Sequence, residues 1–126
     1  MATTAPLNVL VVDNDWLIRM SATEMLDDLG HEGTAVPTAE AALRLLKGGC
    51  DIDLMLLDVG LPDMDGRQLA ALALGLRPSL RIVFASGYGP ERIGEAASHL
   101  NAAYLAKPYL LDDLRRAMNG HDQRSS

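Results

Sequence analysis

The stretch that decides the fold of this chain is Asp53-Leu54-Met55-Leu56-Leu57-Asp58-Val59-Gly60-Leu61-Pro62-Asp63-Met64-Asp65-Gly66. Its first part is a short, continuous apolar run, which is typical of a strand that is buried on both faces. The run ends in Asp58, and a turn rich in Gly, Pro and Asp follows it. A carboxylate at the end of a buried strand is well placed for chemistry.

Three other apolar runs also end in polar or reactive groups. If the strands are parallel, all these groups meet at one edge of a sheet, in the crevice where open α/β sheets bind their ligands. The runs are residues 9–12, which lead to Asp13-Asn14-Asp15, residues 81–85, which lead to Ser86, and residues 102–106, which lead to Lys107-Pro108.

Helical patterns separate the strands, and a weaker strand is predicted at residues 32–36. Trp16 is expected to pack at the start of the first helix, and Thr38 to cap the second. A fourth helix is expected within residues 91–100. The apolar faces of the other helices are expected to carry Ile18, Ala22, Met25 and Leu29; Ala42, Leu45 and Leu46; Leu69, Leu72 and Leu76; and Leu111, Leu114 and Met118.

This alternation predicts a doubly wound, five-stranded parallel sheet of the flavodoxin-like α/β class, with helices on both faces. The chain of 126 residues has room for one domain. We expect its core at about residues 7–118, and flexible ends at residues 1–6 and 119–126.

Composition restricts the partners. A net charge of -6 and a pI near 4.8 argue against direct nucleic-acid binding, which needs clustered Lys and Arg. The first apolar run is interrupted by Asp13, so neither a signal peptide nor a membrane span is predicted. Cys50 is the only cysteine, which favours a reducing, cytoplasmic setting.

The four strand ends together resemble a known family. In chain order they are Val12-Asp13-Asn14-Asp15, residues 58–66, Ser86-Gly87 and Lys107-Pro108. This series resembles the receiver domain of two-component response regulators, of the chemotaxis-regulator kind, and the resemblance extends from about Leu7 to Met118.

The resemblance implies a signalling switch that catalyses only its own phosphorylation and dephosphorylation. Asp58 would accept a phosphoryl group from a histidine kinase or a phosphotransfer protein. Lys107 and Ser86 would contact the phosphoryl oxygens. A hard divalent cation, Mg²⁺, would be held by oxygen ligands from Asp13, Asn14, Asp58 and the backbone carbonyl of Gly60.

The resemblance also implies how the switch works. Ser86 would move toward the phosphoryl group, Tyr104 would change its exposure, and the surface of the fourth helix, fifth strand and fifth helix would carry the signal. It further implies a cis Lys107-Pro108 bond. The plainer interpretation of Tyr104 is a half-buried strand tyrosine.

Asn14 departs from the family, which usually has two adjacent acids at this point. An amide oxygen can ligate Mg²⁺, but one negative charge is lost. Asp15 would supply it if it faced the metal, or it would simply cap the first helix. The metal affinity therefore depends on which role Asp15 has.

Each site residue also has an ordinary interpretation. Asp58 alone is compatible with a turn-initiating Asp, Lys107 with a solvated lysine, and Ser86 with a loop residue. Their coincidence at successive strand ends favours the functional interpretation.

Two other functions stay open. One is a receiver-like interaction module that no longer takes phosphate. The other is a phosphatase like the haloacid dehalogenases, with Asp13 as the nucleophile, although Asp112-Asp113 follow Lys107 too closely for the further acidic motif such enzymes need.

The sequence does not identify the downstream process that such a switch would control. It fits either a stand-alone receiver or part of a larger protein such as a hybrid kinase. Leu110 stands where many receivers have a polar helix cap. It would either be covered by a partner or pack under the fourth helix.

Overall fold

The computed structural model describes residues 6–87 and 102–119, and these form a five-stranded parallel sheet in the order β2-β1-β3-β4-β5. The predicted flavodoxin-like α/β class is confirmed. The helix expected within residues 91–100 and nearly all of the expected flexible ends lie outside the described residues. The elements are β1 Asn8–Val12, α1 Trp16–Asp28, β2 Glu32–Val36, α2 Ala39–Lys47, β3 Leu54–Asp58, α3 Gly66–Leu76, β4 Arg81–Ser86, β5 Ala103–Ala106 and α5 Leu111–Met118.

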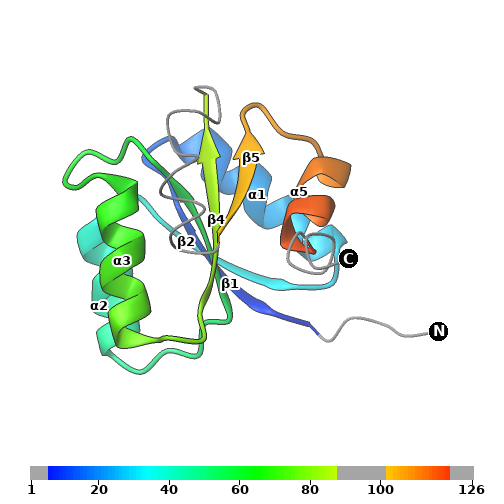
Figure 1. Ribbon diagram of the computed structural model, residues 1–126. Coiled ribbons are helices and arrows are strands. Elements are labelled where there is room, and N and C mark those ends of the chain that lie inside the picture. The colour runs from blue at the N-terminus through cyan, green and yellow to red at the C-terminus, as the bar shows by residue number, and fades with distance from the viewer. Residues whose placement is uncertain (1–5, 88–101, 120–126) are drawn as a thin grey trace.

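The sheet separates two apolar clusters. Successive strand residues point to opposite faces, so Leu10 and Val12 pack with α2 and α3, while Val9 and Val11 pack with α1 and α5. Figure 1 shows α2 and α3 on one side of the sheet and α1 and α5 on the other. This two-sided burial explains why the strands read as continuous apolar runs.

Side-chain caps fix where three helices begin. Asp15 accepts a hydrogen bond from the Leu17 N–H at 3.0 Å, Thr38 from Ala41 at 3.1 Å, and Asp65 from Arg67 at 2.8 Å. Each cap satisfies a backbone donor that has no partner within its own helix. The cap predicted at Thr38 is confirmed.

Helix α5 begins differently. Leu110 offers no capping oxygen, and its backbone N–H donates to the carboxylate of Asp113 at 2.9 Å. The Leu110 side chain is 71% exposed, so it lies on the surface. The fourth helix, under which Leu110 would pack in one of its two expected arrangements, lies outside the described residues.

Four apolar side chains that the sequence predicts to be packed are exposed instead. Trp16 begins α1, but its side chain is 62% exposed. Leu72 and Leu76 lie on the outer side of α3, because its buried face consists of Gly66, Leu69, Ala70 and Ala73, whose small members bring the helix close to the sheet. Leu111 is likewise exposed, and only Leu114 and Met118 of its helical face are buried.

Among the described helices, none combines the length and the hydropathy needed to span a membrane.

Candidate phosphoryl-acceptor site

The parallel register brings the predicted site residues to one edge of the sheet. Asp58 pairs with Ala85 across β3 and β4, and Ser86 pairs with Ala106 across β4 and β5. Asp13 and Lys107 directly follow β1 and β5. The carboxyl ends of four strands therefore present these side chains together, as expected for a doubly wound sheet.

Lys107 bridges the two carboxylates. Its Nζ lies 2.7 Å from Asp13 Oδ2 and 3.4 Å from Asp58 Oδ2. The side chains of Lys107, Asp13 and Asp58 are 14%, 5% and 19% exposed, so solvent only partly screens the contacts between them. The lysine partly offsets the repulsion between the two acids, and its backbone N–H is anchored on the Ser86 carbonyl at 2.9 Å. The Lys107-Pro108 bond is cis, as predicted.

Asp13 is fixed at each of its polar atoms. Its N–H donates to the Val36 carbonyl at 3.1 Å, and its Oδ1 accepts from the Asp15 N–H at 2.9 Å. Its carbonyl accepts from Arg19 Nη1 at 2.8 Å. With Lys107 on Oδ2, the buried carboxylate is held in a single orientation.

Asp15 has the role of a helix cap. Its carboxylate accepts from Leu17, and its N–H supports Asp13. Asn14 and Asp15 are both exposed. Whether Asp15 also contributes charge to a bound metal stays a prediction.

The β3–α3 turn approaches β3 closely. The Gly60 N–H donates to Asp58 Oδ1 at 3.3 Å, and the Gly66 N–H donates to the Val59 carbonyl at 2.7 Å. A Cβ on Gly66 would overlap the Asp58 carbonyl oxygen and lie 2.7 Å from the Val59 Cα. Gly66 is therefore required for α3 to begin beside the Asp58 backbone, a role that our sequence reasoning missed.

Asp63 ties the same turn to α2. Its carboxylate accepts hydrogen bonds from the Ala39 and Glu40 N–H groups at 3.0 and 2.9 Å. These bonds hold the pKa of Asp63 below its usual value. The sequence shows only that Asp63 is a carboxylate in a turn. It does not reveal that the hydrogen-bond donors, Ala39 and Glu40, lie in a helix more than twenty residues earlier.

Ser86 and Tyr104 lie on the neighbouring strands β4 and β5, two register positions apart. Ser86 is buried at the end of β4, and Tyr104 is half-buried on β5 opposite Phe84, where it packs on the α2–α3 side of the core. The half-buried position agrees with the plainer interpretation of Tyr104. The proposed switch also involves residues 88–101, which lie outside the described residues.

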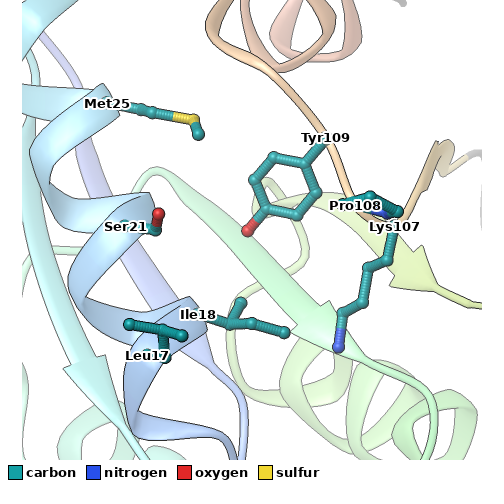
Figure 2. A pocket seen from close by; sticks show the side chains of 7 residues that line it. All are labelled: Leu17, Ile18, Ser21, Met25, Lys107, Pro108 and Tyr109. Carbon is teal, nitrogen blue, oxygen red and sulfur yellow. The ribbon is translucent and has the colours of Figure 1, made fainter.

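A pocket of about 390 Å³ opens between α1 and the turn after β5. The buried ring of Tyr109 directs its hydroxyl toward α1 (Figure 2). Burial, followed by the charges of Asp13 and Asp58, raises the pKa of Tyr109 to about 12. The phenol therefore stays neutral at physiological pH. The lining residues are Leu17, Ile18, Ser21, Met25, Lys107, Pro108 and Tyr109.

The donor set suits a hard cation. Within residues 6–87 and 102–119 no three His, Cys, Asp or Glu side chains gather as a metal site, so the two carboxylates would be supplemented by amide and carbonyl oxygens. Mg²⁺ characteristically uses one or two carboxylates and keeps several waters. Asp13, Asp58, Asn14 and the Gly60 carbonyl are compatible with that ion.

Fold and site define a flavodoxin-like α/β domain with a lysine and two acids at the carboxyl edge of its sheet. The model of the response regulator receiver domain matches residues 9–119, and the chain belongs to this family. It is 38% identical over 102 residues to the response regulator protein FleR of Pseudomonas aeruginosa, covering 80% of this chain and 21% of FleR.

A second curated relative and a solved structure support the same family assignment. The DNA-binding transcriptional regulator NtrC of Azospirillum brasilense is 34% identical over 118 residues, covering 90% of this chain and 24% of NtrC. A CheY-like receiver domain from Methanospirillum hungatei JF-1 has a TM-score of 0.83 at 28% identity, with 96% of this chain and 98% of that one covered. The chain thus spans about a quarter or less of the length of these two curated relatives.

Proposed function

We propose that this domain is a phosphorylation-activated switch that accepts a phosphoryl group on Asp58. The observation that carries the proposal is the Asp58 carboxylate at the mouth of the sheet, beside Lys107 and the acidic loop after β1. The donor would be a phosphohistidine of a kinase or a phosphotransfer protein. An oxygen of Asp58 would form the new bond to phosphorus as the bond from phosphorus to the histidine nitrogen breaks.

The residues around Asp58 have separate roles. Lys107 would place a fixed positive charge beside the transferring phosphoryl oxygens, and Ser86 would donate its hydroxyl to one of them. Asp13, Asn14, Asp58 and the Gly60 carbonyl would hold Mg²⁺, which supplies charge neutralisation when bound. Because the phosphoryl group would be transferred onto Asp58 of the domain itself, the domain would be a signalling element that acts on no separate substrate.

The output would pass through the surface of residues 91–100, β5 and α5. Ser86 on β4 and Tyr104 on β5 lie on paired strands, which supports a coupled movement of both side chains. The family supports a regulatory role.

A protein partner would contact exposed apolar side chains at the pocket in Figure 2. Leu17, which lines the pocket from α1, is 59% exposed, and Leu110, which follows the lining residue Tyr109 in the chain, is 71% exposed. Exposed apolar side chains around a pocket are typical of interaction sites. We place the partnership in the cytoplasm because a lone cysteine favours reducing conditions.

The test is to map the acyl phosphate. The protein is incubated with acetyl phosphate and Mg²⁺, reduced with borohydride and analysed by mass spectrometry, alongside Asp58→Asn. Label on Asp58 alone, lost in the variant, is expected. Label on Asp13 would support the phosphatase alternative, and no label from acetyl phosphate or from candidate kinases would support the phosphate-independent module.

Leu17→Ser combined with Leu110→Ser tests the partner surface. We expect slower transfer from the cognate kinase and unchanged labelling by acetyl phosphate, because the small donor needs no docking surface. Equal loss with both donors would mean that the substitutions disturb the site itself.

A further inference from the structure

Arg19 holds the acidic loop after β1 from the first turns of α1. Its Nη1 donates to the Asp13 carbonyl at 2.8 Å and to the Asn14 carbonyl at 3.0 Å. Its backbone N–H donates to the Asp15 carbonyl at 3.0 Å. One residue therefore binds the carbonyl groups of three consecutive loop residues.

These contacts fix the direction of the loop side chains. When the carbonyls of Asp13 and Asn14 are both held by one nitrogen, the peptide planes on either side of Asn14 are constrained. The remaining polar atoms of Asp13 already have partners in Val36, Asp15 and Lys107. Arg19 thus completes the set of contacts that orients the Asp13 carboxylate.

We propose that Arg19 is a positioning residue for cation binding at this loop. It acts through the backbone of Asp13 and Asn14 and touches no reacting group. The inference rests on the proposed function, because it assumes that Asp13 and Asn14 bind Mg²⁺. Outer residues that orient metal ligands typically contribute tenfold to a hundredfold to metal affinity.

Charge and position have opposite effects here. The guanidinium is positive, so electrostatics alone disfavours a cation nearby, and removing Arg19 would tighten Mg²⁺ binding. Loss of positioning would weaken it. The sign of the change in affinity therefore separates the two roles, and a purely structural role would lower thermal stability without changing the affinity.

The experiment compares Mg²⁺ binding by titration calorimetry in wild type, Arg19→Met, Arg19→Lys and Arg44→Met. Arg44 is the matched control, because it is exposed on α2 and pairs with Glu40 away from the loop. We expect Arg19→Met to weaken Mg²⁺ binding by about tenfold. Arg19→Lys, which keeps one nitrogen on a shorter side chain, should recover part of the affinity, and Arg44→Met should match wild type.

A second measurement needs no metal. Amide hydrogen exchange at Asp15 reports the Asp15 N–H bond to Asp13 Oδ1, and it should become faster in Arg19→Met than in Arg44→Met. Unchanged exchange and unchanged or tighter Mg²⁺ binding would overturn the inference, as would a wild type that binds no Mg²⁺. If Arg19→Met does not fold, the same comparison is made with Arg19→Lys. Neither readout requires phosphorylation, so failure of labelling at Asp58 remains a separate result.

Discussion

Lys107 Nζ lies closer to Asp13, at 2.7 Å, than to Asp58, at 3.4 Å. The lysine therefore pairs most closely with the buried carboxylate after β1, while the Asp58 carboxylate is more exposed at the mouth of the sheet. In the function proposed above, this arrangement would leave Asp58 available to an incoming phosphoryl group and keep Lys107 within reach of it.

Lys107→Met should lower the free energy of unfolding by about 3 kcal/mol, because it leaves two partly buried carboxylates without their cation. Lys47→Met, at the exposed end of α2, is the control and should change little. Denaturation by urea measures both. Adding Asp13→Asn to Lys107→Met should restore part of the loss, and strictly additive effects would show that the two side chains do not interact.

Gly66→Ala should destabilise the domain by about 3 kcal/mol, because its Cβ would overlap backbone atoms of Asp58 and Val59. Gly75→Ala is a matched control in the same helix, where a Cβ meets nothing within 4 Å. The control should stabilise the domain by about 1 kcal/mol through helix propensity. Thermal unfolding of both variants tests the contrast, and equal effects would refute the close approach at Gly66.

Asn14→Asp should tighten Mg²⁺ binding, most strongly at low ionic strength. A unit charge 4 Å from a divalent ion contributes about 2 kcal/mol in water, so at least a tenfold change is expected. Titration followed by Trp16 fluorescence or calorimetry measures it. Equal affinities of the two proteins would indicate that Asp15 already supplies the charge despite its role as a cap.

Ser86→Ala should leave a protein that is phosphorylated on Asp58 but switches poorly. The hydroxyl would bond a phosphoryl oxygen only in the active state, so its loss reduces the population shift. Amide chemical shifts of both proteins, with and without a beryllofluoride mimic, report the change. If residues 91–109 respond equally in wild type and variant, Ser86 does not couple the site to the surface.

Asp63 gives the stability a dependence on acid pH. Its pKa is lowered in the folded protein by the hydrogen bonds from Ala39 and Glu40, so its contribution is present above the ordinary value of 3.8 and lost as pH falls through the lower folded value. Asp63→Asn should be less stable than wild type at neutral pH, and the difference should shrink below pH 3.8. Asp51→Asn, in the exposed loop before β3, is the control. A difference that stays constant with pH would exclude this linkage.

The sequence by itself determined the fold class and most of the site. Short continuous apolar runs are typical of strands buried on both faces, and parallel strands bring the residues at their ends, Asp13, Asp58, Ser86 and Lys107, to one edge. These conclusions depend on local patterns and on chain order. The sequence therefore contained enough information to predict them.

Only the tertiary structure decided which atoms meet. The bonds of Arg19 to the acidic loop, the reach of Asp63 to α2 and the close approach at Gly66 depend on where the elements lie in space. The exposed positions of Leu72 and Leu76 could not be predicted from helical spacing, because the small residues of α3 determine which face approaches the sheet. The exposure of Trp16 could not be predicted either, because an apolar side chain at a helix start carries no signal of its surroundings. Contacts between distant segments follow from packing, which no local pattern encodes.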